Sequence, residues 1–506
     1  MAKMPQGWTV APVRDIAVIT PKHPANTDPN LSVSFVPMQA VSEAGWRFLL
    51  DQERRFSDVR KGYTHFADGD VLLAKIKPCF ENGKAAIARG LRNCIGCGTT
   101  ELHVLRPLGG IKPEYLYHYL HQESFRHDAV PHMTGSAGQL RVPVSYIEDV
   151  LVPLPPIPEQ HRIVAKLEEL LGKVDACQKR LERIPFFLKR FRKSVLATGC
   201  SGKLTGVWRS SHQEIAPMKQ RLPMLEEDRR KQAYTNSRGE QKQAPMIDLG
   251  NRTKGIDELF DLPETWEWVS LGQITWNIAD GPHFSPKYVD ASSGVPFISA
   301  RNISYEKIDF SDAKHVSKAD HREFIKRARP VRGDVLLTKG GTTGVATVVG
   351  TDSEFSIWVH IALLKIVRQF VLPEYLRDAL TTPSAFAQSQ AQTHGVGNQD
   401  LGLTRMVHIA LPLPPIEEQE EIVRQVQSLY EVADQIESSY KAAKASVDQL
   451  RQSILAKAFL GELVPQDPND EPAEVLLGRI RAGRECDNSK SSRVRTRNKQ
   501  PEGVHS

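Results

Sequence analysis

The feature that most constrains the fold is an apolar pattern that occurs twice along the chain. After PLPPIPEQ at 153–160, apolar residues recur in alternating steps of four and three, and the same alternation follows PLPPIEEQ at 412–419. A repeat averaging about 3.5 residues over about four heptads is typical of a coiled coil, because it keeps one apolar stripe facing a partner helix. The predicted seam consists of Ile163, Leu167, Leu170, Val174, Leu181, Leu188 and Phe191 in the first segment and Ile422, Val426, Leu429, Ile436, Val447, Leu450 and Ile454 in the second.

Each segment is expected to form one helix that begins at the repeated octapeptide. Proline suits the start of a helix, and the Glu-Gln pair would supply acceptors near the unpaired N–H groups there. About 39 residues correspond to about 58 Å at about 1.5 Å per residue. Pro185 lacks a backbone donor and is expected to kink the first helix near its middle, where the second copy has Lys444.

The two helical segments carry opposite charge bias. Residues 159–197 hold ten Lys/Arg and five Asp/Glu, whereas residues 417–457 hold five Lys/Arg and eight Asp/Glu. Because complementary charges beside an apolar seam favour pairing, we expect the two helices to pack against each other. The same heptads also allow each helix to pair with a second copy of the chain.

The repeat extends beyond the helices, so the chain is a duplicated pair of units. Residues 134–156 align without gaps with 393–415, and GDVLLAKIKP resembles GDVLLTKGGT. Before each helix, short β-rich runs are separated by Gly, Asn, Asp and Pro, and short helical pieces follow. This texture indicates a compact α+β domain of about 150 residues. The predicted fold class is therefore α+β, with two such domains, each followed by a long helix.

The expected boundaries follow from these patterns. They are a first domain at 1–152 with its helical segment at 153–205, a polar connector at 206–262, a second domain at 263–411 with its helical segment at 412–464, and a basic, disordered tail at 465–506.

Composition excludes some classes of protein. No apolar run approaches the about 18 residues that cross a bilayer, and the first residues lack a secretory pattern, so a cytoplasmic protein is expected. A net charge of +6 is a weak indicator of nucleic-acid binding. Cys94 and Cys97 form a CxxC pair, which Cys79 and His103 could complete as a zinc site. Free thiols in a reducing compartment are the preferred interpretation, and no metal site is expected.

Motifs of catalysis do not occur. The sequence has no GxxxxGK[ST], GxSxG or HExxH, and both Pro-Pro pairs lack the preceding Asn or Asp and following aromatic residue of an adenine methyltransferase. GDVLLAK and GDVLLTK each hold a single acid, short of the acidic pair that a nuclease needs. These patterns favour a binding protein over an enzyme.

Two kinds of loop are candidates for DNA contact. The first follows the GDVLL runs, where Lys suits phosphate and Asn or Thr suits base edges; an ordinary exposed hairpin is the alternative. Its candidates are Lys75, Lys77, Asn82 and Lys84 in the first copy and Lys339, Thr342 and Thr343 in the second. The second kind is a Gly-rich stretch before each PLPP, where Gln and Asn suit adenine; a simple turn is the alternative. Its candidates are Ser136, Gln139, Arg141, Asn398 and Gln399.

The whole pattern resembles the DNA-specificity subunit of Type I restriction–modification systems. The resemblance covers residues 5–464 and rests on PLPPxxEQ with its heptads and on the helix ends KRFRKSVLATGCSGKLT and QSILAKAFLGELV. The segments IPFFLKRFRKSVLATGCSGKLTGVWR and ADQIESSYKAAKASVDQLRQSILAKAFLGELV look close to enteric-bacterial members. The connector at 206–262 is a departure, since the family motifs do not fix its course.

The resemblance implies a function without chemistry in this chain. Each domain would read one half of a bipartite target in double-stranded DNA, and the two helices, packed antiparallel with pseudo-twofold symmetry, would set the unread gap. Two modification subunits would carry S-adenosylmethionine and methylate adenine, and restriction subunits would carry ATP, Mg²⁺, translocation and cleavage. This chain would hold no cofactor of its own.

Two other functions compete with this one. A fused methyltransferase–specificity chain would need a cofactor motif that the sequence lacks. A coiled-coil scaffold that binds only proteins would not need two diversified β-rich domains with basic loops. An adenine-methyltransferase gene beside this one would favour the specificity subunit.

Overall fold

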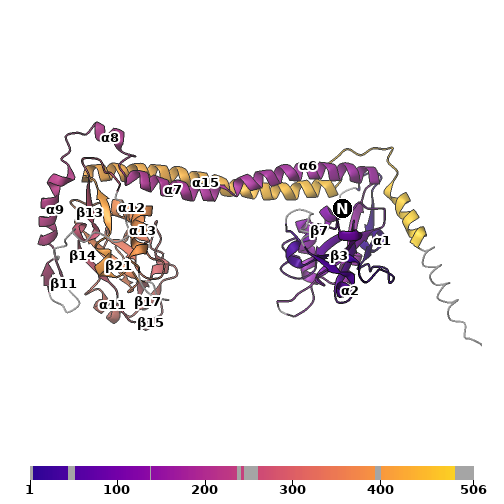
Figure 1. Cartoon of the computed structure of the whole chain (residues 1–506), viewed down its shortest axis with the longest axis horizontal. Helices are drawn as coiled ribbons and strands as arrows, with labels where there is room; N and C mark the ends of the chain where they lie inside the picture. Colours follow the sequence, from indigo (N-terminus) through magenta and orange to yellow (C-terminus); the bar gives the residue numbers. More distant parts are fainter. Residues whose placement is uncertain are drawn as a thin grey trace, which may run out of the picture. The chain divides into compact units, whose positions relative to one another are not determined.

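The computed structural model describes residues 4–43, 52–136, 138–235, 241–243, 260–393 and 400–484. The chain divides into two compact units, Met1–Glu182 with Lys441–Ser506, and Arg183–Tyr440. Each unit contains one β-rich domain and one stretch of paired helices (Figure 1).

The first unit is built on three small sheets. A ribbon pairs β1 (Thr9–Pro12) with β10 (Leu151–Leu154). One four-stranded sheet has the order β2 (Ala17–Ile19), β9 (Leu102–Pro107), β6 (Val71–Ala74), β7 (Ala85–Ile87). The other has the order β4 (Glu53–Arg55), β3 (Ser32–Val36), β8 (Ile95–Gly98), β5 (Thr64–Ala67). Helices cover them: α1 (Val13–Ile16), α2 (Phe56–Val59), α3 (Pro113–Leu120), α4 (Glu123–Ala129) and α5 (Val144–Asp149).

The second unit repeats this plan with one difference, which is the edge of its second four-stranded sheet that carries the fourth strand. Its ribbon pairs β13 (Glu267–Ser270) with β22 (Ala410–Leu413). Its sheets have the orders β14 (Thr275–Asp280), β21 (Ile361–Ile366), β18 (Val335–Thr338), β19 (Ala346–Val348), and β15 (Tyr288–Val289), β17 (Lys314–Val316), β16 (Val295–Ile298), β20 (Ser356–Ile357). Its short helices are α10 (Leu271–Ile274), α11 (Lys318–Phe324), α12 (Pro373–Thr381), α13 (Pro383–Ala391) and α14 (Leu403–Met406).

The GDVLL runs form a central strand of one four-stranded sheet in each unit. All four residues of β6 and all four of β18 are buried, because each strand pairs on both sides and both of its faces are covered. A strand buried on both faces reads as a continuous apolar run. The predicted α+β class and its duplication are confirmed.

The repeated octapeptide fastens each helix to its own domain. PLPP forms β10 in one unit and β22 in the other. Glu159 accepts a hydrogen bond from the Trp8 indole at 3.0 Å, and Glu418 accepts one from Trp266 at 2.8 Å. The predicted capping role of the Glu-Gln pair is wrong for the first helix, where no side chain caps the start.

Among the described residues, the glutamine side chain of each pair bonds only backbone atoms. Gln160 accepts from the N–H of Lys112 at 2.8 Å and donates to the carbonyls of Gly110 and Pro155. Gln419 repeats this pattern with the N–H of Leu372 at 2.9 Å and the carbonyls of Phe370 and Pro414. The two copies of the motif are therefore alike because each attaches a long helix to its domain in the same way.

The first long helix is interrupted, as Pro185 predicts. It consists of α6 (Ile157–Leu181) and α7 (Ile184–Gly199), with Glu182 and Arg183 between them. Pro185 lies in the first turn of α7, where its missing N–H has no intrahelical partner to lose. The second helix, α15 (Ile416–Phe459), is continuous.

The helices pack antiparallel in each unit (Figure 1). In the second unit, Gly199 of α7 faces Ile422, while Arg192, two turns earlier, pairs with Asp434 at 2.6 Å and Glu437 at 2.9 Å on α15. In the first unit, Asp175 of α6 pairs with Arg451 of α15.

Most of the side chains predicted for the seam are buried or half-buried, and three are exposed. Buried or half-buried positions are Ile163, Leu167, Leu170, Val174, Leu181, Leu188, Ile422, Val426, Leu429, Val447 and Ile454. Phe191, Ile436 and Leu450 are 38%, 45% and 51% exposed. On α7, Leu188 and Val195 keep the heptad spacing and are buried together with Leu196, whereas Phe191 is exposed. Beside Ile436, the ion pairs of Arg192 occupy the helix contact.

The connector and the tail both contain packed helices. In the second unit, α8 (Gly206–Ser210) and α9 (Met218–Lys231) follow α7, and Met218 and Leu225 join the core. In the first unit, residues 473–484 are helical; Ala473 and Leu477 are 1% exposed, and the N–H of Ala473 donates to Gly7. The expectation of a disordered tail is wrong for 465–484, because apolar residues at helical spacing cover the first domain. The remaining tail, 485–506, and most of 236–259 lie outside the described residues.

Candidate nucleic-acid interface

The two loops predicted separately in the first domain lie side by side. Ile76 and Arg141 form an antiparallel bridge, the N–H of Lys77 donates to Leu140, and the N–H of Val142 donates to Lys75, both at 2.9 Å. Residues 75–84 leave the central strand β6, and residues 134–142 return toward α5. The backbone therefore joins both groups of candidates into one surface.

Acidic neighbours occupy several of the charged candidates. Arg141 donates twice to Glu101, at 2.9 Å each, and this hydrogen bonding lowers the pKa of the Glu101 carboxyl. Lys77 pairs with Glu81 at 3.1 Å, and the Asn82 amide donates to Glu43. Arg141 is therefore better placed to hold the loop than to read a base.

The other candidates of this domain differ in exposure. Lys75 is half-buried, and the Lys84 ammonium lies 3.5 Å from the carbonyl of Met38. Ser136 and Gln139 are exposed at the tip of the second loop. These two side chains, with Asn82, are the neutral groups that this surface offers to base edges.

The second domain joins its two loops in the same way. The N–H of Leu401 donates to the carbonyl of Lys339 at 2.7 Å, and Gly340 forms a bridge with Asp400. The Lys339 side chain is 4% exposed, and its ammonium lies 2.9 Å from Asp400 and 3.4 Å from Asp280. The structure thus buries Lys339 beneath the loop that it was predicted to present.

The tip of this loop exposes one candidate and buries another. Thr343 is buried, and its hydroxyl accepts from the Gln390 amide of α13 at 2.7 Å. Thr342 is exposed between Gly341 and Thr343. Gly341 has φ +74°, a conformation that glycine adopts without strain, and this turns the loop at that point. Asn398 and Gln399 lie outside the described residues.

Sequence reasoning missed the acids that hold these loops. Glu101 precedes β9, and Asp280 ends β14, where it also pairs with Arg327 and lies 3.2 Å from His283. An acid at a strand end is visible in the sequence. Its basic partner, 40 residues away for Glu101 and Arg141, is specified only by the sheet order.

The cysteine and histidine side chains that were considered as zinc ligands lie in different surroundings. In the described ranges no group of three His, Cys, Asp or Glu side chains could hold a metal ion. Cys97 is buried, which raises the pKa of its thiol to about 12, whereas Cys94 is exposed. The His103 ring bonds the carbonyl of Val142 at 2.8 Å, and burial lowers the pKa of His103 to about 4. Over the same described ranges, no helix is long and apolar enough to cross a membrane.

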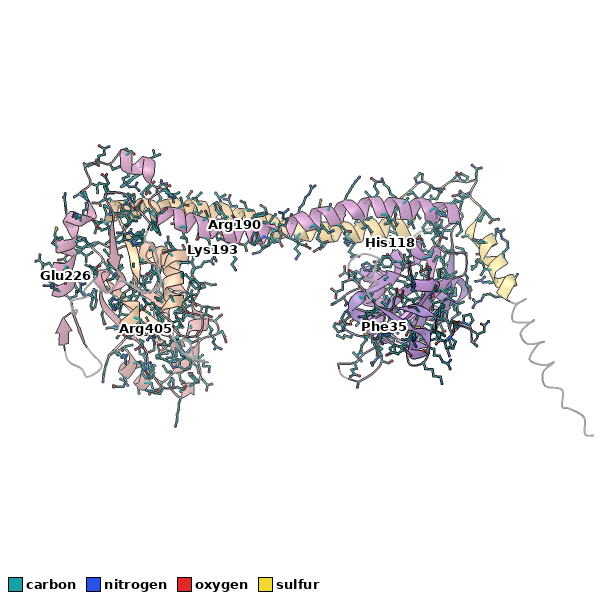
Figure 2. All side chains as sticks on the ribbon, in the orientation of Figure 1. Phe35, His118, Arg190, Lys193, Glu226 and Arg405 are labelled. Atoms are coloured by element: carbon teal, nitrogen blue, oxygen red, sulfur yellow. The ribbon has the colours of Figure 1, made fainter. Side chains whose placement is uncertain are left out.

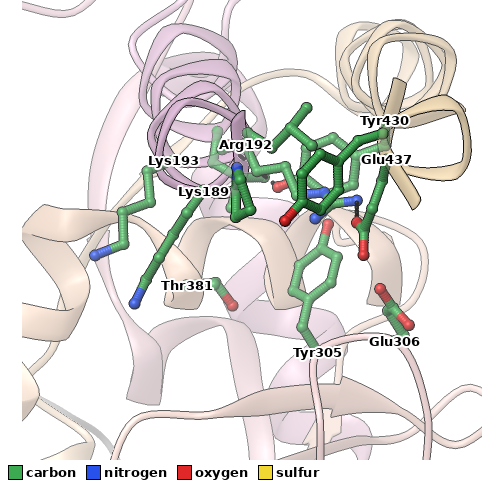
Figure 3. A pocket seen from close by; sticks show the side chains of 12 residues that line it. Lys189, Arg192, Lys193, Tyr305, Glu306, Thr381, Tyr430 and Glu437 are labelled. Carbon is green, nitrogen blue, oxygen red and sulfur yellow. Dashed lines mark hydrogen bonds and ion pairs between the residues drawn. The ribbon is translucent and has the colours of Figure 1, made fainter. Parts of the chain in front are cut away.

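A hollow of about 440 Å³ lies within the second unit, between its paired helices and its β-rich domain. Lys193, labelled on α7 in Figure 2, lines it together with Lys189, and Tyr305 and Tyr430 form its middle. Figure 3 shows the two lysines extending to one side and Glu306 and Glu437 lying on the other. The Tyr305 hydroxyl donates to Asp378 at 2.6 Å, which fixes this wall.

Comparison with known proteins identifies the same arrangement elsewhere. The family model described as "Type I restriction modification DNA specificity domain" matches residues 5–185 and again 263–443. The chain is 27% identical over 514 residues to the Type I restriction enzyme EcoEI specificity subunit of Escherichia coli, covering 90% of this chain and 83% of that one. It is 31% identical over 356 residues to the EcoBI specificity subunit of Escherichia coli, covering 68% and 67%.

Two solved structures share the fold. One, described as the "structural basis underlying complex assembly and conformational transition of the type I R-M system", has TM-score 0.67 and 19% identity, covering 91% of this chain and all of that one. The HsdS subunit from Thermoanaerobacter tengcongensis has TM-score 0.53 and 20% identity, covering 91% and 98%.

Proposed function

Because the chain belongs to the Type I restriction–modification DNA specificity family, we propose that it directs such a complex to a bipartite DNA target, each β-rich domain reading one half-site. The observation that carries this proposal is the duplication. The family model matches twice, and in both domains a loop after the central strand pairs with a loop before the PLPP strand. Two like surfaces suit a target made of two short blocks.

The exposed neutral side chains would read bases and the basic ones would contact phosphates. Asn82 and Gln139 in the first domain and Thr342 in the second can donate to or accept from base edges. Lys77 and Lys84 suit phosphate oxygens, which position a protein on DNA without specifying sequence. Lys339 and Arg141 would act indirectly, by holding the loops.

The long helices would set the unread gap between half-sites. α15 has 44 residues, which correspond to about 66 Å and exceed one turn of DNA at about 34–36 Å. We expect that four residues inserted after Ser438 would lengthen the gap in the methylated motif and leave both half-sites unchanged. Long-read mapping of modified adenines measures both, and an unaltered gap would contradict this role.

This chain would be non-catalytic and work with partner subunits in the cytoplasm. Two modification subunits would bring S-adenosylmethionine, and restriction subunits would bring ATP and Mg²⁺. The helices offer them apolar surface, since Phe186, Phe187 and Val432 are exposed along α7 and α15. Exposed aromatic side chains of this kind are enriched at protein interfaces.

The deciding experiment is a methylome. The chain would be expressed with its neighbouring modification subunit in a methylation-free host, and modified adenines would be mapped by long-read sequencing. A motif of two short blocks around a fixed gap is the expected result. A continuous methylated motif would contradict the proposal that each domain reads one half-site. No methylation, with the modification subunit shown active beside another specificity chain, would favour a scaffold protein.

A further inference from the structure

Helix α7 is unusually basic for a helix in a paired arrangement. It contains Lys189, Arg190, Arg192 and Lys193 and no Asp or Glu. Arg192 is engaged with Asp434 and Glu437 on α15. Among the described residues, neither Lys189 nor Lys193 has an acidic partner within 4.0 Å. Two cations that contribute to no ion pair within the unit are available to an external anion.

The two lysines face the same side of the second unit. They are four residues apart on one helix, so their side chains are neighbours about 6 Å apart at Cβ. Both line the hollow between α7 and the β-rich domain, and Figure 3 shows them extending away from Glu306 and Glu437. An anion can therefore approach the lysine end without meeting these two carboxylates.

Helix α13 connects this place to the loop that bears Thr342. Thr381, at the end of α12, lines the hollow with the lysines, and Gln390, near the end of α13, donates to Thr343 in the loop. α13 begins two residues after Thr381 and has nine residues, which correspond to a length of about 13 Å. This length is shorter than one turn of DNA, which is about 34–36 Å.

We propose that Lys189 and Lys193 contact the DNA backbone beside the second half-site, independently of sequence. The proposal rests on the proposed function, and it adds a phosphate contact made by a spacer helix. Adjacent phosphates of one strand present charges at a spacing that two lysines four residues apart can match. Such contacts raise affinity, and they make it depend on salt because bound counterions are released.

The test measures the salt dependence of DNA binding by the full complex with its modification subunits. The probe is a duplex carrying the target found in the methylome, and the variant is Lys189→Gln with Lys193→Gln. Each neutralised phosphate contributes about 0.9 to the slope of log affinity against log salt, so the variant's slope should be shallower by about 1.8. Its methylated motif should remain that of the wild type.

A matched control removes two charges elsewhere in the same unit. Lys203→Gln with Lys219→Gln changes exposed lysines that do not line the hollow, and its slope should equal the wild-type slope. An unchanged slope in the Lys189/Lys193 variant, or an equal fall in the control, overturns the proposal. Loss of assembly with the modification subunits, read by native mass, also overturns it, because the lysines would then belong to a protein interface. A wild-type complex that methylates no split motif overturns the proposed function and the inference with it.

Discussion

The two copies of the Glu-Gln motif satisfy the same glutamate in different ways. Glu418 accepts from Trp266, from the Thr205 hydroxyl at 2.7 Å and from the Arg209 guanidinium at 2.7 Å. Glu159 accepts from Trp8 and lies 3.5 Å from the Gln466 amide, and burial raises the pKa of its carboxyl. Duplication preserved the attachment of helix to domain, while the charge balance around it diverged. The second unit has an ion pair where the first has neutral donors.

Removing each glutamate gives the largest expected contrast. Glu418→Ala leaves the Arg209 cation without its carboxylate, and breaking such a buried pair costs about 3–5 kcal/mol of unfolding free energy. Glu159→Ala removes one neutral hydrogen bond at the Trp8 indole and should cost about 1–2 kcal/mol. Hydrogen exchange of the β13–β22 and β1–β10 amides reads both units in one sample. Equal losses would show that the arginine contributes nothing to the difference.

The two units should also differ in how much folding stability they lose at acidic pH. Burial lowers the pKa of His103 and His118, each to about 4, in the first unit. A folded pKa below the unfolded value of about 6.5 means that the unfolded chain binds more protons. Stability from these groups is therefore complete above about pH 6.5 and is lost as pH falls toward 4. At pH 5 each buried histidine lowers the free energy of unfolding by about 2 kcal/mol relative to neutral pH.

His118→Leu isolates this effect. The variant should lose about 2 kcal/mol less than wild type between pH 7 and pH 5, measured by amide exchange in the first unit. Among described residues the second unit buries His321, whose ring bonds Ser356 and lies 3.7 Å from Glu354. The exposed His127→Leu serves as the control and should leave the acid loss unchanged. An acid loss in His118→Leu equal to wild type would contradict the buried-histidine origin.

Each of the ion pairs that hold the loops should affect the recognition of one half-site only. Lys339→Met removes the link between Asp280 and Asp400 and should relax the second half-site, with discrimination falling by about 1–3 kcal/mol. Arg141→Met should relax only the first, by less, since the Arg141–Glu101 pair is more exposed. The methylated motif reports both. Glu101→Arg with Arg141→Glu should restore the first half-site, and relaxation of both half-sites by either single change would refute the assignment.

The smallest effect is expected at the misassigned seam positions. Ile436→Ala and Leu450→Ala truncate exposed side chains and should change the unfolding free energy by under about 0.5 kcal/mol. Ile422→Ala, at a buried position of the same helix, is the comparison that should destabilise measurably. If Ile436→Ala lowered the unfolding free energy by more than about 2 kcal/mol, Ile436 would have to pack in the seam as first predicted.

Local patterns predicted the features that depend on neighbours in sequence. The heptads predicted the helices, Pro185 predicted the interruption, and the buried VLL runs predicted the central strands β6 and β18. Contacts between distant residues escaped prediction. Lys339 follows an apolar strand and reads as the start of an exposed loop, but Asp280, 59 residues earlier, draws its ammonium inside. Ala473 and Leu477 looked like part of a polar tail because the surface they cover belongs to the opposite end of the sequence.

The glutamine attachment has a consequence for how such a protein can change. In the part of the chain that the structure describes, the Gln160 and Gln419 side chains bond only peptide groups, and peptide groups are the same whatever side chains the domain carries. These glutamine bonds can therefore persist when the side chains of a domain change, provided that its backbone and the tryptophan that donates to Glu159 or Glu418 are kept. New target sequences can arise by exchanging one module while the junction stays constant.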